Sequence, residues 1–240
     1  MKTTMTPTQY SITNSTGEYT RAVWLMTAPT DEPHRLCVFL DAEHYLRDMD
    51  CPPVITGLIQ NGLIPLVSCV FISHVSGAAR QQDYLWNERY ARFIAEDVIA
   101  WCSERLNIQT VGNVMCGLSL SGLEGALIAL LYPERFPDVL CQSGSFWWLA
   151  QQERSLPKTS AKFWLSVGDQ ETETGVTHAP LGLFQEVSQI AGVEWVASRL
   201  QRLGATVKYR QYAGGHAIAP WREELSLALP WLLSSTEKNE

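Results

Sequence analysis

Short apolar runs that alternate with amphipathic segments constrain the fold of this sequence more than any other feature. Residues 36–40, 66–72 and 163–167 are apolar with at most one serine each, and Pro, Asp or Gly lies on at least one side of each run. Strands that are buried on both faces have this pattern. We therefore predict an α/β fold with a mostly parallel central sheet and helices on both faces.

The remaining elements follow from the same patterns. Further strands are expected at residues 23–26, 110–116, 139–142 and 207–212. Helical spacing predicts helices at 53–61, from about 88 to 105, at 121–132, up to about 204, and from about 219 to 233. An acidic loop that contains glycine is expected at 168–180.

Composition narrows the class of protein. The 240 residues are 46% hydrophobic and 18% charged, which suits one domain over residues 1–240 with a large core. The net charge of −7 and the lack of a basic run argue against nucleic acid as a partner. The first residues have no apolar segment of signal-peptide type, and no long apolar run follows, so we expect a cytoplasmic protein that does not enter membranes.

The six cysteines carry no metal-site or disulfide signature. They lack C-x-x-C spacing and lie mostly in apolar runs. We interpret them as buried thiols in a reducing compartment, and expect neither a metal nor a cofactor.

The stretch VMCGLSLSGLEGA at residues 114–126 contains the strongest chemical motif. Its G-L-S-L-S segment matches the G-x-S-x-G turn of serine hydrolases except that Ser121 replaces the last glycine. A shifted motif with Ser121 as nucleophile would need glycine at position 119, so Ser119 is the better candidate. Ser121 is small enough for the turn, and with Glu124 three residues later it could cap the next helix.

The expected chain order of serine, acid and histidine locates the other catalytic groups. His216 follows the predicted strand 207–212 in Y-A-G-G-H and is the candidate base, whereas His178 lacks a preceding strand and is expected at the surface. Asp169, Glu171 and Glu173 all follow the strand 163–167, and the pattern does not choose among these carboxylates.

Two backbone amides are expected to form the oxyanion hole. One is the N–H of Leu120, directly after the nucleophile. The other should come from the loop after strand 36–40, with Glu43 as first candidate and Ala42 as second. Ser143 and Ser145 follow a later strand and fit a pocket wall.

Several stretches taken together resemble the esterase D family of α/β-hydrolases, and within it the catalytic domain of enterochelin (enterobactin) esterases. These stretches are F-L-D-A-E at 39–43, R-Q-Q-D-Y-L-W-N at 80–87, the turn at 117–122, Y-P-E-R-F at 132–136, Q-S-G-S-F-W-W at 142–148 and G-G-H at 214–216 with W-R at 221–222. The resemblance implies the α/β-hydrolase fold and a serine esterase that acts on a small-molecule ester through an acyl-enzyme. It also raises the hypothesis of a siderophore-type ester.

The same resemblance implies roles for individual residues. It supports Ser119 as nucleophile and His216 as base, and favours Glu171 as the acid, with Asp169 as the alternate. Trp147, Trp148 and Arg80 would line or brace the substrate pocket, as would Asn87. Ala42 and Ser121 stand where the family usually has glycine, beside the oxyanion hole. This departure motivates the alternative of a non-catalytic binding protein, and an acyltransferase or thioesterase is the alternative within the family.

Overall fold

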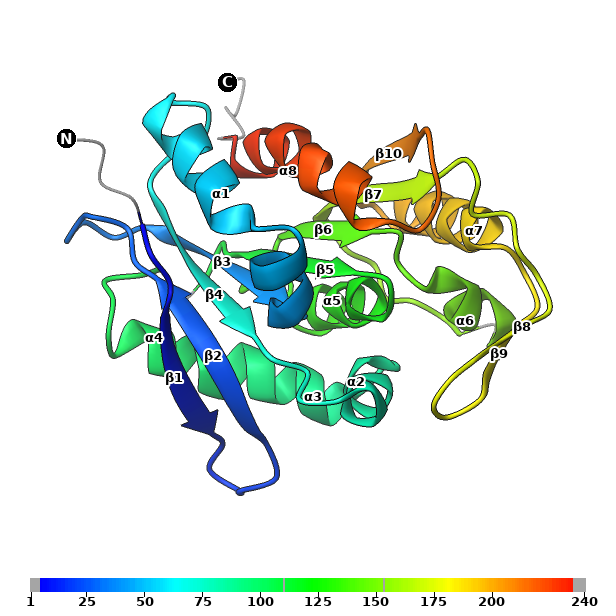
Figure 1. The fold of residues 1–240 in the computed structure, drawn as a ribbon, viewed down its shortest axis with the longest axis horizontal. Coiled ribbons are helices and arrows are strands. Elements are labelled where there is room, and N and C mark those ends of the chain that lie inside the picture. The colour runs from blue at the N-terminus through cyan, green and yellow to red at the C-terminus, as the bar shows by residue number, and fades with distance from the viewer. Residues whose placement is uncertain (1–4, 110, 153, 235–240) are drawn as a thin grey trace.

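The computed structural model of the protein describes residues 5–109, 111–152 and 154–234 (Figure 1). Within these ranges, eight strands form one sheet in the order β1-β2-β4-β3-β5-β6-β7-β10. The strands are β1 (Thr8–Thr13), β2 (Thr20–Met26), β3 (Arg35–Leu40), β4 (Val67–Ile72), β5 (Val114–Leu118), β6 (Asp138–Gln142), β7 (Lys162–Gly168) and β10 (Thr206–Tyr212).

The sheet is parallel from β4 to β10, and β1 and β2 extend it as antiparallel strands. The fold class predicted from the apolar runs is confirmed. Because the parallel strands share one direction, their carboxyl ends meet at one edge of the sheet, where α/β proteins form their binding sites.

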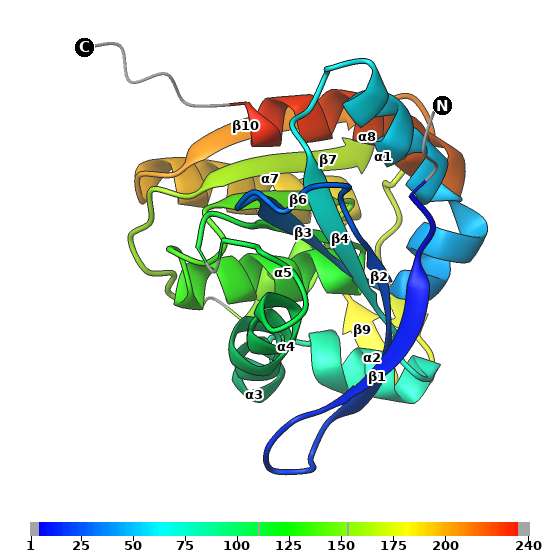
Figure 2. The same cartoon turned by 90° about the vertical axis from the view of Figure 1, so that its left-hand side faces the viewer.

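Helices cover both faces of the sheet (Figure 2). On one face lie α1 (Cys51–Gln60) and α8 (Ile218–Leu233). On the other lie a continuous helical segment made of α3 (Glu88–Arg92), η2 (Phe93–Val98) and α4 (Ile99–Ser103), together with α5 (Leu120–Leu131) and α7 (Gln189–Arg202). Strand β3 shows why the strand runs are wholly apolar: Leu36, Val38 and Leu40 enter one core, and Cys37 and Phe39 enter the other.

The structure also contains short elements that the sequence patterns did not predict. They are η1 (Glu43–Asp48), α2 (Gly77–Tyr84), α6 (Phe146–Gln151) and the hairpin of β8 (Val176–His178) and β9 (Leu183–Gln185), which begins inside the expected loop 168–180. The strand expected at 110–116 lies instead at Val114–Leu118, and Thr110 is outside the described residues. None of the helices in the described part of the chain is long and apolar enough to cross a membrane.

Candidate active site

Ser119 lies in a strained turn between β5 and α5. Its backbone has φ 53° and ψ −123°, a combination that residues other than glycine rarely adopt. A Cβ on Gly117 would come 2.2 Å from the carbonyl oxygen of Ser121, so only glycine fits at position 117. The Ser119 N–H donates to the Gln142 carbonyl on β6 at 2.9 Å. The turn thus holds Ser119 at the carboxyl edge of the sheet, where it lines a cavity.

His216 lies on the loop between β10 and α8, and its ring is held by Glu171. The Nδ1 atom is 2.6 Å from Glu171 Oε2, and the ring packs edge-on against Trp221 with the centroids 4.7 Å apart. His216 lines the same cavity as Ser119. Since the carboxylate engages Nδ1, Nε2 is the ring nitrogen that remains available to accept a proton.

Glu171 is oriented by three donors to its other carboxylate oxygen. Its Oε1 accepts hydrogen bonds from Ser143 Oγ at 2.7 Å, from the Gly168 N–H at 2.7 Å and from the Tyr212 hydroxyl at 3.0 Å. Burial by itself would raise the pKa of Glu171, but His216 and the hydrogen bonds from Ser143 and the Gly168 N–H bring that pKa below its usual value. Glu171 is therefore an ionised carboxylate with Oε2 directed at the imidazole.

The other two candidate carboxylates have different partners. Asp169 Oδ1 accepts the Gly214 N–H at 2.9 Å and so braces the loop that carries His216. Glu173 lines the cavity and is exposed. Of the three acids left open by the sequence pattern, Glu171 is the one that the structure places on the histidine.

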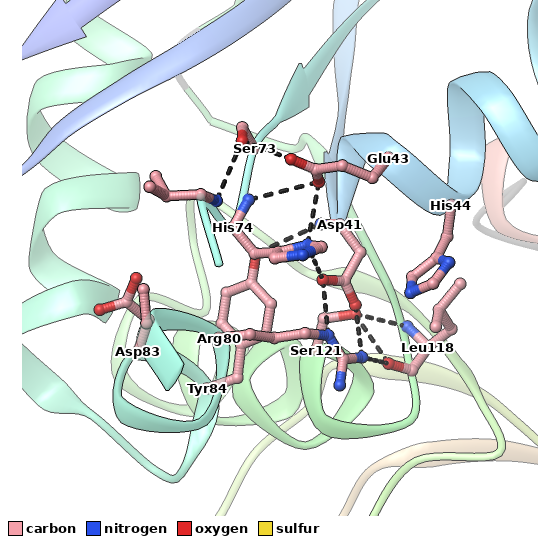
Figure 3. Close-up of polar contacts among 12 residues, drawn as sticks. Asp41, Glu43, His44, Ser73, His74, Arg80, Asp83, Tyr84, Leu118 and Ser121 are labelled. Carbon is pink, nitrogen blue, oxygen red and sulfur yellow. Dashed lines mark hydrogen bonds and ion pairs between the residues drawn. The ribbon is translucent and has the colours of Figure 1, made fainter. Parts of the chain in front are cut away.

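The candidate oxyanion donors lie on two separate segments. Leu120 begins α5 and lines the cavity. Ala42 and Glu43 follow Asp41, whose φ of 62° turns the chain out of β3 and into η1. Both Asp41 oxygens accept from Arg80, with Nε at 2.8 Å from Oδ1 and Nη2 at 2.6 Å from Oδ2 (Figure 3).

A compact charged cluster surrounds this loop. His74 Nδ1 lies 3.1 Å from Asp41 Oδ1 and 2.9 Å from Glu43 Oε2, and Glu43 also accepts from the Ser73 hydroxyl. Burial opposes the ionisation of Asp41, yet Arg80 and His74 hold its pKa well below the usual range. Burial likewise opposes the ionisation of Glu43, whose pKa His74 and Ser73 lower to about 2. The two carboxylates raise the pKa of His74 to about 9.

Ser121 does not cap the helix, contrary to the sequence-based expectation. Helix α5 begins at Leu120, one residue earlier than expected, with Ser119 at the capping position. The Ser121 Oγ instead lies 2.8 Å from both the N–H and the carbonyl oxygen of Leu118. Glu124 does not form a capping box either, because its Oε2 accepts the Asn87 N–H at 2.9 Å and burial raises its pKa well above the usual value.

The cavity beside Ser119 has a volume of about 490 Å³. Arg80 and Trp147 line it, as the resemblance implied. Trp148 does not, since its ring packs against the core and lies 5.4 Å from the Arg154 guanidinium. His178, expected at the surface, is also in the wall: the β8–β9 hairpin brings its ring onto Trp147, with the centroids 5.3 Å apart and the planes at 19°.

Several residues of the site gave no clear signal in the sequence. Ser145 lines the cavity as expected, but Ser143 is fully buried and binds Glu171. Tyr212, the last residue of β10, was not singled out, although its place four residues before the candidate base is a signal that could have identified it. Gln81 lines the cavity from α2, a helix that was not predicted.

Comparison with known proteins identifies the family of this chain. Residues 24–232 match the family model described as "Putative esterase". The chain belongs to this esterase family. An iron(III) enterobactin esterase of Dickeya dadantii is 27% identical over 230 residues, which cover 90% of this chain and 52% of that protein. The one from Escherichia coli K12 is 28% identical over 220 residues, which cover 87% and 52%.

A solved structure supports the same fold for this esterase-family chain. The enterochelin esterase from Shigella flexneri superimposes with a TM-score of 0.80 at 22% identity, covering 94% of this chain and 57% of that one. The chain thus spans about half the length of the curated relatives that it matches.

Proposed function

We propose that this protein is a serine esterase that hydrolyses a carboxylic ester through an acyl-enzyme, with Ser119, His216 and Glu171 as catalytic triad. The observation that carries the proposal is the 2.6 Å contact between Glu171 Oε2 and His216 Nδ1, on a ring that shares a cavity with Ser119. A serine hydroxyl needs such an oriented base to become a nucleophile. Membership of an esterase family supports the same reaction.

The proposed reaction has two halves. His216 Nε2 takes the Ser119 proton as Oγ attacks the ester carbonyl, and the Leu120 N–H and the N–H of Glu43 or Ala42 bind the oxyanion. The imidazolium returns its proton to the alcohol as the C–O bond breaks. Water, deprotonated by His216, then attacks the acyl-enzyme and releases the acid. Glu171 stabilises the imidazolium in both halves.

The substrate is proposed to be a siderophore-type ester. The support is the name of the curated relatives, iron(III) enterobactin esterase, and the aromatic wall formed by Trp147 and His178 in the cavity. A cytoplasmic location is part of this proposal, and it is supported by six cysteines that are all buried free thiols.

An ester assay with Ser119→Ala tests the reaction. With p-nitrophenyl butyrate we expect kcat to fall by about 10³-fold or more, because the nucleophile is lost. Ser145→Ala removes another hydroxyl from the same cavity and should retain most of the activity. A fluorophosphonate probe should label the wild type at Ser119 only. Equal rates for wild type and Ser119→Ala would refute the assignment.

A product assay tests the substrate class separately. The protein is incubated with iron(III) enterobactin and with the iron-free compound, and ring-opened products are followed by chromatography. Products that depend on Ser119 support the siderophore proposal. Hydrolysis of p-nitrophenyl butyrate without any enterobactin cleavage would leave the esterase mechanism in place and reject this substrate.

A further inference from the structure

One buried carboxylate connects the two segments that carry the oxyanion amides. Asp41 is completely buried, and its side chain accepts from Arg80 and pairs with His74 (Figure 3). The Ser121 hydroxyl is a further polar neighbour that helps to lower its pKa. The backbone N–H of Asp41 donates to the Tyr84 hydroxyl at 3.2 Å, and its φ is 62°. Both carboxylate oxygens of Asp41 therefore have partners. These contacts help to hold a strained backbone conformation at this residue.

Ser121 is the partner of Asp41 on the nucleophile turn. This serine is also fully buried. Its Oγ accepts the Leu118 N–H at 2.8 Å and donates its proton to the Leu118 carbonyl, also at 2.8 Å. The same hydroxyl lies close enough to the Asp41 carboxylate to help lower the pKa of that group. The Ser121 hydroxyl thus bonds the residue just before Ser119 and contacts the residue just before the loop 42–43. Arg80 Nη2 joins the same two residues, at 3.4 Å from the Leu118 carbonyl oxygen and 2.6 Å from Asp41 Oδ2.

The close approach of α5 to β5 does not explain why residue 121 is a serine. Gly117 and Gly122 provide that approach, since a Cβ would meet the Ser121 carbonyl at 2.2 Å in the first case and the Gly144 Cα at 3.0 Å in the second. The side chain at position 121 faces Asp41 instead. Its distinctive contribution is therefore the hydroxyl.

We propose that Ser121 and Asp41 are positioning residues that hold the nucleophile turn and the loop 42–43 in register, so that both oxyanion amides face the same point. The proposal rests on the proposed function, in which Ser119 is the nucleophile. An oxyanion hole stabilises the transition state only when its donors are fixed before the reaction, and a misplacement of well under 1 Å weakens it. The link joins the two donors across different elements, α5 and η1.

The kinetic test removes the hydroxyl with Ser121→Ala. We expect kcat for p-nitrophenyl butyrate to fall by about 10- to 100-fold with KM within about twofold, because the lost alignment acts in the transition state. The rate of fluorophosphonate labelling at Ser119 should fall in parallel. Ser68→Ala is the matched control: Ser68 is equally buried, accepts the Ala28 N–H at 2.9 Å and bonds His34, but lies outside the site.

A second measurement monitors how firmly the loop 42–43 is held and does not require catalysis. Hydrogen–deuterium exchange in peptides that cover residues 41–46 should become at least severalfold faster in Ser121→Ala and stay unchanged in Ser68→Ala. Faster exchange together with the kcat loss supports the proposal. Unchanged exchange at 41–46 overturns it, even if kcat falls. If the wild type neither hydrolyses esters nor reacts with the probe, the proposed function fails, whereas the exchange data still decide whether Ser121 holds the loop.

Discussion

At the residue scale, Asp169 and Glu171 have different hydrogen-bond partners because they occupy different positions in the turn after β7. Both follow β7, yet only Glu171 reaches His216, while Asp169 accepts the Gly214 N–H. The chain turns tightly after β7, because the Glu171 N–H donates to the Gly168 carbonyl at 3.2 Å. The Glu171 side chain turns back to the end of β7, where its Oε1 accepts the Gly168 N–H at 2.7 Å. Backbone geometry thus decides which of the two carboxylates contacts His216.

Glu171→Gln tests the acid. An amide in place of the carboxylate no longer stabilises the imidazolium, so kcat for p-nitrophenyl butyrate should fall by about 10²- to 10⁴-fold. Asp169→Asn is the control, because its amide oxygen can still accept the Gly214 N–H. We expect that variant to stay within about threefold of the wild type. A larger loss in Asp169→Asn than in Glu171→Gln would reverse the assignment.

Ser143→Ala tests the support of the acid. Ser143 is fully buried with φ 45°, a strained conformation, and its hydroxyl donates to Glu171 Oε1 at 2.7 Å. Without it the carboxylate loses one of its donors, so we expect kcat to fall by about 5- to 50-fold with KM little changed. Steady-state kinetics measure this split. A rise in KM alone would indicate that Ser143 acts on substrate binding instead.

At the scale of elements, the β8–β9 hairpin forms one wall of the cavity. Gln81 on α2 holds it from both ends of the turn, donating to the Ala179 carbonyl at 2.6 Å and accepting the Leu181 N–H at 2.8 Å. His178 Nε2 lies 2.8 Å from Gln185 Oε1 across the hairpin, while its ring stacks on Trp147. The hairpin therefore adds the stacked rings of His178 and Trp147 to one wall of the cavity.

His178→Ala tests this wall through substrate selectivity. Loss of the stacked ring should raise KM for p-nitrophenyl benzoate by about 3- to 10-fold, which corresponds to the energy of one aromatic contact. The acetate ester is too small to need the wall, so its KM should change by less than twofold. The two esters are compared on the same preparation, and equal changes in KM would place His178 outside the acyl-binding surface.

The sequence predicted the long elements and missed the short ones for a physical reason. Strands buried on both faces, such as β3 and β7, are apolar throughout and therefore visible as patterns. Helix α2 has few apolar residues, and β8 and β9 have three residues each, so no period can be recognised. Gln81 and His178 lie on those elements, which is why their place in the cavity emerged only from the structure.

Backbone conformation limited the prediction of the site in a similar way. In the expected order of serine, acid and histidine, each group follows a strand. Ser119 and His216 could be chosen from the sequence because the strands before them were predicted. The role of Ser121 depends on where one hydroxyl points after a strained turn, and local sequence rules favoured a helix cap there. Long-range contacts such as the one between Ser121 and Asp41 leave no trace in sequence spacing.

At the scale of the whole molecule, the charged cluster around the loop 42–43 connects segments that are distant in the sequence. The cluster contains two cations, Arg80 on α2 and His74 after β4. Its two anions are the carboxylates of Asp41 and Glu43, which follow β3. The Asp41 side chain has no exposure, and those of Arg80 and His74 are 16% exposed. Removal of one partner would leave a buried charge uncompensated, which typically costs about 3–5 kcal/mol. Site geometry and global stability therefore depend on the same contacts.

Because of this cluster, we expect the free energy of unfolding to fall as the pH rises from neutral to alkaline values. The folded-state pKa of His74 is raised from 6.5 to about 9 by its contacts with Asp41 and Glu43. Its protonated form therefore stabilises the fold fully below about pH 6.5, and the contribution disappears as the pH rises through about 9. Other groups near the ring are His44, at 6.1 Å between centroids, and Asp83.

Denaturant unfolding at several pH values measures this effect. Between pH 6.5 and 9.5 we expect the wild type to lose on the order of 2 kcal/mol more unfolding free energy than His74→Gln, a value reduced for the solvent that reaches the ring. The variant should be less stable at neutral pH and should depend less on pH, since glutamine does not titrate. Thiols and tyrosines titrate in both proteins and cancel in the difference. Parallel stability curves would show that His74 is not the group that links pH to the fold.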